Sequence, residues 1–216
     1  TFFTGFIQTT VGVNDRISLG ADALFRSTRT NGPDDSQFDV FGFGNGPDRR
    51  TALALLGPKV KFTPVGSIPN LAIQSTFLFP LGDNLEGRDA NRPFLEHDDF
   101  QWWNQVFYDR RLSDLFLAYV EASAFFRLDS ADENAADEWI FPLKAILNVL
   151  PTSKTTFYGI LDYTPSTNSA YYFQTGIGAK YLPAPGLELE VLATTFPVGQ
   201  NRGAGSTLNF GIRVVR

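Results

Sequence analysis

Hydrophobic and polar residues alternate along most of the chain, and the segment DLFLAYVEASAFFRLD at 114–129 shows this most clearly. Every second residue from Phe116 to Leu128 is apolar, whereas the positions between them include Glu121 and Arg127. Because successive side chains of a β-strand point to opposite faces, the segment predicts a strand with one apolar and one mixed face. The apolar face packs on a core in a soluble sheet and meets lipid in a membrane barrel.

The same alternation recurs and predicts further strands, which together account for most of the sequence. With lengths of about 9 to 14 residues, they are longer than the usual strand of a soluble protein and match a tilted strand that crosses a bilayer. The predicted strands are residues 2–13, 16–28, 51–63, 71–79, 100–110, 115–128, 139–150, 155–164, 171–182, 187–197 and 206–215.

Short and long connections alternate between these strands. The short ones, such as 14–15 and 183–186, are rich in the turn-forming residues Pro, Gly, Asn and Asp. Outer-membrane barrels have short periplasmic turns at one end and long external loops at the other, whereas a soluble sandwich has no reason to separate loops by length. The long, polar connections are 29–50, 80–99, 129–138, 165–170 and 198–205.

Aromatic residues near the predicted strand ends agree with this interpretation. Tyr171 and Tyr181 bracket the aliphatic positions of one strand, as in the aromatic girdles at the two membrane interfaces. We therefore expect an all-β fold: one transmembrane antiparallel up-and-down β-barrel domain over residues 1–216, in the outer membrane of a Gram-negative bacterium. Other aromatic residues near strand ends are Trp102, Trp103, Tyr108, Trp139 and Tyr163.

The predicted strands number eleven, which leaves the two ends of the barrel on opposite sides of the membrane. A twelfth strand before Thr1 would restore the parity, as would a merged or split strand. The chain has no Met, including at position 1. We therefore expect that a segment preceding Thr1, such as a signal peptide, has been removed.

The amino-acid composition argues against several kinds of partner, site and membrane span. The net charge of −5 argues against a nucleic-acid partner. The absence of Cys excludes disulfides and thiolate metal sites. The sequence contains no apolar run of about 18 residues, so it predicts no transmembrane helix.

Several segments resemble bacterial outer-membrane β-barrels, and most of all an uncharacterised family found in Bacteroidota. The resemblance covers nearly the whole chain, but it lies in barrel-like strands and turns rather than in catalytic signatures, so it implies a fold and no activity. It is carried by GPKVKFTPVGSIPNLAIQSTFLFPLGDNLEG at 57–87, KTTFYGILDYTP at 154–165, YYFQTGIGAKY at 171–181 and the closing STLNFGIRVVR.

Charged residues of both signs fall on the mixed face. Opposed charges of this kind line pores for polar solutes, so the leading hypothesis is a narrow passive channel. The alternative is that these charges pair and plug a structural or docking barrel, and a weaker alternative is a soluble ligand-binding β-barrel. The candidate lining residues are Asp22, Arg26, Lys59, Lys61, Glu121, Arg127, Lys144, Asp162, Lys180, Glu188, Glu190 and Arg213.

The predicted external loops supply candidate contacts. The apolar residues Phe38, Val40, Phe41 and Phe43 are unusual in a polar loop; they would either fold into the lumen as a constriction or dock a partner. We expect outer-membrane lipid around the barrel and other envelope proteins at loops 29–50 and 80–99. The candidate loop-contact residues are Phe38, Phe41, Phe43, Trp102 and Trp103.

Enzyme chemistry and cofactors are not expected. His97 is the single histidine, and its loop contains no serine that could act as a nucleophile. The acidic stretches 34–35, 96–99 and 129–138 lack EF-hand spacing, so we interpret them as solvated charge rather than as metal sites. The GFGNG at 42–46 opens no predicted helix and is not a dinucleotide-binding motif.

Overall fold

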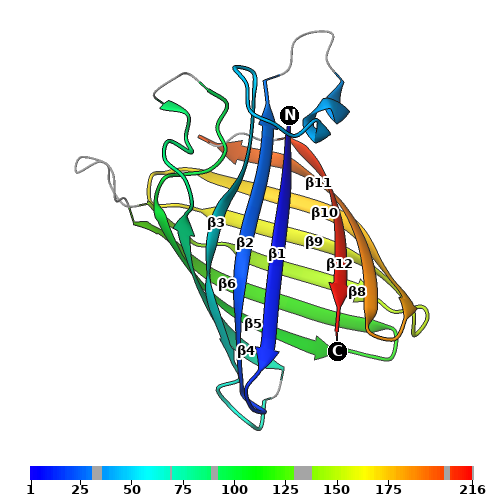
Figure 1. Cartoon of the computed structure of the whole chain (residues 1–216). Coiled ribbons are helices and arrows are strands. Elements are labelled where there is room, and N and C mark those ends of the chain that lie inside the picture. The colour runs from blue at the N-terminus through cyan, green and yellow to red at the C-terminus, as the bar shows by residue number, and fades with distance from the viewer. Residues whose placement is uncertain (31–35, 69, 89–91, 129–137, 202–204, 216) are drawn as a thin grey trace. The chain divides into compact units, whose positions relative to one another are not determined.

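The computed structural model describes residues 1–30, 36–68, 70–88, 92–128, 138–201 and 205–215. Twelve strands form one sheet in which neighbours along the chain are also neighbours in space, in the order β1-β2-β3-β4-β5-β6-β8-β9-β10-β11-β12, and β7 pairs with β6 beside this path (Figure 1). The recorded strand registers are antiparallel, from β1 against β2 to β11 against β12. This order is an up-and-down meander, as the sequence predicts.

The strands agree closely with those predicted. Their bounds are β1 Phe2–Gly12, β2 Ile17–Arg29, β3 Arg49–Phe62, β4 Leu71–Pro80, β5 Phe100–Arg111, β6 Phe116–Leu128, β7 Glu138–Ile140, β8 Leu143–Val149, β9 Thr155–Pro165, β10 Tyr171–Ala184, β11 Leu187–Gln200 and β12 Ser206–Val214, with a 3-10 helix η1 at Gln37–Phe41. In the described part of the chain, no helix is long and apolar enough to cross a membrane.

One predicted strand, 139–150, is divided in two. β7 ends at Ile140 and β8 begins at Leu143, with Pro142 between them. Proline has no N–H to donate to a strand ladder, so it interrupts the pairing. Its carbonyl still accepts a hydrogen bond from the Ser123 N–H at 2.8 Å.

The short turns have the chemistry expected of them. Asn14 Oδ1, Ser113 Oγ and Thr152 Oγ1 each accept hydrogen bonds from the backbone N–H groups two and three residues ahead, at 2.9–3.2 Å. Side chains of this type replace missing backbone partners in a tight turn. Gly186 has a φ of +77°, a conformation that favours glycine.

Two compact units are distinguished within the chain. Unit 1 comprises Thr1–Phe62, Gln74–Asn104 and Phe126–Asp137, and unit 2 comprises Thr63–Ile73, Gln105–Phe125 and Glu138–Arg216. Each unit is described by itself below. That the whole of 1–216 forms a single domain stays a prediction.

In unit 1 the two sheet faces differ in chemistry. Lys59 on β3 is buried, whereas its neighbours Pro58 and Val60 are exposed. Asp22 lies on the same face of β2 and contacts Lys59. We call the face that carries Asp22 and Lys59 the polar face, and the opposite face, which carries Val60, the apolar face.

Unit 2 shows the same separation. On β6, Val120 is 49% exposed, whereas Glu121 and Ser123 are each 7% exposed. On β9, Phe157 and Leu161 are exposed, and Asp162 is buried on the other face. The face of 114–129 that is uniformly apolar in sequence is thus the outward one, and Glu121 lies on the covered polar face of this unit.

Candidate functional site

The polar face of unit 1 contains a buried ion pair. Lys59 Nζ contacts Asp22 Oδ1, and the side chains are buried almost completely, with residue exposures of 5% and 0%. Thr76 Oγ1 and Gln8 Nε2 donate to the second carboxylate oxygen, Asp22 Oδ2, at 3.4 and 3.3 Å. The carboxylate is therefore balanced by a lysine on β3 and by two neutral donors, Gln8 on β1 and Thr76 on β4.

A second group on the polar face, in unit 2, surrounds Lys144, and we call it the β8 cluster. Lys144 Nζ lies 3.9 Å from Glu121 Oε2 and 3.8 Å from Asp162 Oδ2. Because one lysine faces two carboxylates, the cluster carries a net negative charge when all three are ionised.

Neutral side chains complete the β8 cluster. Gln105 Nε2 and Ser123 Oγ each donate to Glu121 Oε1 at 2.8 Å, and the Tyr119 hydroxyl donates to Glu121 Oε2 at 2.7 Å. Thr164 Oγ1 donates to Asp162 at 2.7 Å. These donors hold both carboxylates in place without adding positive charge.

The β10 cluster is a third charged group, formed by Lys180, Glu188, Glu190, Arg213 and Tyr158. Lys180 Nζ lies 3.8 Å from Glu188 and 3.7 Å from Glu190, and Arg213 Nη2 lies 3.2 Å from Glu188. The Tyr158 hydroxyl donates to Glu190, and its ring lies 5.5 Å from Lys180 Nζ. Two cations and two carboxylates give this cluster no net charge.

Ten of the predicted lining residues are recorded in ion pairs on the polar faces: nine in the three groups above, and Arg26, which lies 3.7 Å from Glu96. Lys61 and Arg127 share the strand positions of this face, and Arg26 does as well. That these residues line a passage stays a prediction. The neutral members Gln8, Gln105, Tyr119, Tyr158 and Thr164 were missed; their signal was that they fall at the same alternating positions as the charges.

The long connection after β4 folds over the polar face of unit 1. Leu85 and Leu95 of this connection are almost fully buried, and they pack in a cluster that includes Leu55 and Leu78, with Leu24 against it. Leu24 is two residues from Asp22 on β2, so it points to the same face. We call the described residues of this connection, 81–88 and 92–99, the covering loop.

Arg50 on β3 holds the covering loop through hydrogen bonds to its backbone. Its Nη1 donates to the carbonyls of Leu85 and Pro93 at 3.2 and 3.1 Å, and its Nη2 donates to the carbonyl of Asn84 at 2.9 Å. Arg50 pairs with Thr28 in the β2–β3 register, which places it on the polar face. A loop expected to project outward is therefore held against the sheet by one buried guanidinium.

His97 lies in the covering loop beside Glu86. Its Nδ1 is 3.0 Å from Glu86 Oε1, and Arg88 Nε donates to Glu86 Oε2. Burial raises the pKa of Glu86, but the hydrogen bonds from His97 and Arg88 outweigh it and hold the pKa below its usual value. The contacts recorded for His97 are with Glu86, Glu96 and the ring of Phe94, and none is with a serine.

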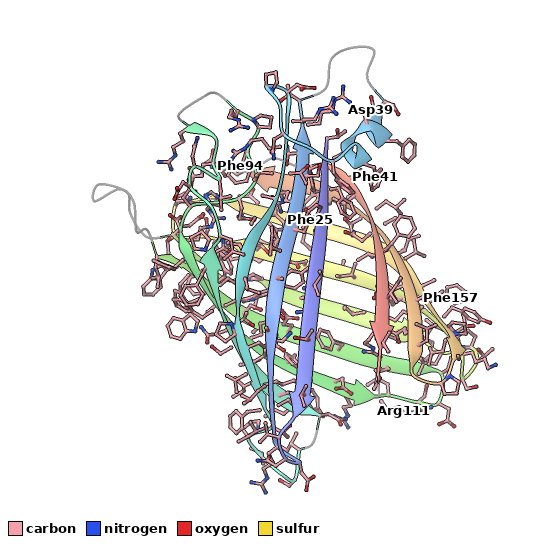
Figure 2. All side chains as sticks on the ribbon, viewed as in Figure 1. Phe25, Asp39, Phe41, Phe94, Arg111 and Phe157 are labelled. Carbon is pink, nitrogen blue, oxygen red and sulfur yellow. The ribbon has the colours of Figure 1, made fainter. Side chains whose placement is uncertain are left out.

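The phenylalanines of the preceding loop lie on the other side of the sheet. Phe43 contacts Phe25 and Phe3, with ring centroids 5.5 and 6.1 Å apart, and Phe41 contacts Phe3 at 5.3 Å. Phe25 is three residues from Asp22 on β2, so it points to the apolar face. Phe41 and Phe43 therefore lie against the apolar face of unit 1 rather than over its polar face, which contradicts the alternative in which they fold into a lumen. Figure 2 labels Phe25 and Phe41.

Other predicted contact residues are distributed differently. Phe38 on η1 is 78% exposed. Trp102 and Trp103 belong to β5 rather than to a loop; the Trp102 ring packs on Phe126 at 5.3 Å. A role for these residues in binding a partner stays a prediction. The acidic stretches 34–35 and 129–137 lie outside the described residues.

Comparison with known proteins agrees with this architecture. No protein-family model matches the chain, and no curated protein is significantly similar to it. Among solved structures, the chain is similar to the crystal structure of an outer membrane channel from Pseudomonas putida F1, with a TM-score of 0.69 and 13% sequence identity over 98% of this chain and 81% of that one. The likeness shows that the chain has the fold of an outer-membrane β-barrel. It gives no support to the narrower assignment to a Bacteroidota family.

Proposed function

We propose that this chain is an integral outer-membrane channel for the passive passage of small polar solutes. The observation that carries the proposal is the separation of faces: in both units, charged and hydrogen-bonding side chains gather on one face and exposed aliphatic and aromatic side chains on the other. Lipid would cover the apolar face, and water and solutes would meet the polar one. The channel named in the similar solved structure supports this assignment.

The charge arrangement favours solutes without a strong charge. The β10 cluster pairs its cations with its carboxylates, and the β8 cluster leaves one carboxylate in excess. A wall of this kind provides hydrogen bonds and a weak negative potential rather than a field of one sign. We therefore expect weak cation selectivity.

Single-channel recording tests the proposal. Purified chain folded in detergent would be inserted into a planar lipid bilayer, with insertion and folding checked separately by protease protection and circular dichroism. Stable, reproducible conductance steps are expected. Silence from protein shown to be folded and inserted would contradict a channel.

Charge variants then test which residues line the passage. Glu188→Gln combined with Glu190→Gln should move the reversal potential in a salt gradient toward anion selectivity, and Lys144→Gln should move it toward cation selectivity. Asp114→Asn, at a fully exposed turn position, is the matched control and should leave it unchanged. If the first two variants have the same reversal potential as the wild-type chain, the clusters do not line the passage.

A docking barrel is the second candidate, and the covering loop favours it. A loop that packs on the polar face with buried Leu85 and Leu95 reduces the room for solutes. Under this function the exposed Phe38 and its neighbours would bind another envelope protein. Deletion of residues 38–43 should then abolish co-purification of that protein, and retained binding would count against docking.

A further inference from the structure

The covering loop brings together side chains that suit a metal ion. One ligand atom from each of Glu86, His97 and Asp99 can be chosen so that all lie within 4.8 Å of one another. His97 Nδ1 and Glu86 Oε1 are already 3.0 Å apart. We propose that Glu86, His97 and Asp99 form a binding site for a divalent transition-metal ion of the Zn²⁺ type.

The donor set decides the class of ion. Zn²⁺ binds imidazole nitrogen and carboxylate oxygen at about 2.0–2.2 Å, so two of its ligands lie about 3 Å apart, as His97 Nδ1 and Glu86 Oε1 do. Ca²⁺ and Mg²⁺ prefer sites built from oxygen alone. A donor set of one imidazole and two carboxylates therefore favours a transition metal, with water completing the coordination.

Two further carboxylates of the loop, Asp98 and Glu96, have recorded partners. Asp98 accepts hydrogen bonds from the backbone N–H groups of Leu85 and Glu86 at 2.6 and 3.4 Å. Glu96 accepts from the His97 N–H at 3.1 Å and pairs with Arg26. These contacts fix the backbone on both sides of the site, and Glu86, His97 and Asp99 each keep a ligand atom within 4.8 Å of the others.

Arg88 supports the site without occupying it. Its Nε bonds Glu86 Oε2, whereas the oxygen that faces His97 is Oε1. Glu86 can therefore give Oε1 to the ion and keep Arg88 on its second oxygen. Partners of this kind hold a ligating carboxylate in orientation.

Metal binding would join the two ends of the covering loop. Glu86 belongs to the first part of the loop, residues 81–88, and His97 and Asp99 belong to the second part, residues 92–99. An ion bound by all three would hold the loop on the polar face more firmly. Binding itself does not depend on the proposed channel function, but its effect on conductance does.

Titration calorimetry tests binding directly. The full chain, folded in detergent and carrying no polyhistidine tag, would be titrated with ZnCl₂ near neutral pH. We expect one ion per chain, and at least a tenfold weaker affinity for His97→Gln and for Glu86→Gln, each checked for folding by circular dichroism. Asp114→Asn should bind as the wild-type chain does. Absence of saturable Zn²⁺ binding, saturation by Ca²⁺ alone, or unchanged affinity in His97→Gln would overturn the proposal.

A spectroscopic readout isolates the site. His97 is the only histidine in the chain, so the imidazole signals of the folded protein report on this residue alone. Zn²⁺ should shift them at one equivalent. Signals that do not move at saturation would exclude His97 as a ligand.

Conductance separates this proposal from the channel function. If the chain conducts, Zn²⁺ should lower or steady the current of the wild-type chain and leave that of His97→Gln unchanged. Zn²⁺ binding without any conductance would remove the channel and leave the metal site standing. Conductance with no Zn²⁺ binding would exclude the metal site and leave the channel function intact. Zn²⁺ binding with no effect on the current would contradict the inference that the ion holds the covering loop on the polar face.

Discussion

Arg50 Nη2 lies 2.9 Å from the carbonyl oxygen of Asn84, a residue 34 positions later in the chain. The same guanidinium also reaches the carbonyls of Leu85 and Pro93. One buried side chain on β3 therefore satisfies three backbone acceptors of the covering loop. We infer that the position of the loop depends strongly on this residue.

Replacement of Arg50 should release the loop. Each hydrogen bond from a charged donor contributes about 1.5–3 kcal/mol, and a buried acceptor left without a partner costs about 1–3 kcal/mol. Arg50→Ala should therefore make the loop sensitive to protease and, if the chain conducts, raise its conductance.

Arg49→Ala is the matched control for that experiment. Arg49 is the preceding residue, and it contacts Asp48 and the Gly42 carbonyl instead of the covering loop. Its loss should leave cleavage of residues 81–99 unchanged. Equal protease sensitivity in the two variants would show that Arg50 does not hold the loop.

The strands could be predicted because each side chain of the sheet meets one of two distinct environments. Val120 and Glu121 are adjacent in sequence, yet one is exposed and the other buried on the opposite face. This alternation is local, so a segment of about 4–8 residues is enough to detect it. The interruption at Pro142 was not predicted, and proline alone does not decide it, since Pro58 lies inside β3 and is paired with Ala21.

The covering loop could not be placed from sequence in the same way. Its position depends on contacts between residues far apart in the chain, such as Arg50 with Pro93. The signal that could have suggested it was the presence of aliphatic residues such as Leu85 and Leu95 in a largely polar connection. A polar loop that exposes both would leave apolar surface in water.

The charged clusters were predicted in part. Alternation placed Lys144 and Asp162 on one face, but their contact depends on strand register. The register sets Lys144 opposite Asp162 across the hairpin with turn 151–154; hairpin length and the alternating pattern together fix such a pairing. The contact of Lys144 with Glu121 gave no comparable local signal, because β6 and β8 are not joined by a short turn.

Removal of one member of the buried pair of Asp22 and Lys59 should destabilise the fold strongly, whereas replacement of both should destabilise it little. Removal of one member of a buried ion pair costs about 3–5 kcal/mol, whereas exchange of both members for uncharged residues is often neutral. We therefore expect Lys59→Met to lower the free energy of unfolding strongly, and the double variant Lys59→Met with Asp22→Asn to recover most of it. Urea unfolding in detergent micelles or lipid gives the values. Additive losses in the double variant would show that the two residues are not coupled.

The phenylalanine group on the apolar face should contribute to stability unevenly. Phe43 contacts the rings of Phe3, Phe25 and Phe41. Aromatic pairs contribute about 0.5–1.5 kcal/mol beyond the area they bury, so Phe43→Ala should lower the free energy of unfolding by at least this amount. Phe38→Ala, at a far more exposed position of the same segment, should have a much smaller effect. Equal losses would mean that the segment does not pack on Phe25 as described.

Acid should loosen the covering loop through Glu86. The pKa of this carboxyl is lowered in the folded chain, because hydrogen bonds from His97 and Arg88 outweigh the opposing effect of burial. A depressed pKa means that the ionised form stabilises the fold at pH values above the unfolded pKa of about 4.5. That contribution should be lost as the pH falls through the lowered pKa.

Glu86→Gln provides the comparison that isolates this group. Above the unfolded pKa the wild-type chain should protect the backbone amides of the covering loop from hydrogen exchange better than the variant does. Below the lowered pKa both side chains are neutral, so the difference should vanish. The exchange must be followed at residues such as Leu95, whose N–H donates to the Leu85 carbonyl at 2.9 Å and which belongs to the loop rather than to a strand. A difference that stays constant with pH would mean that Glu86 acts through its shape and not through its charge.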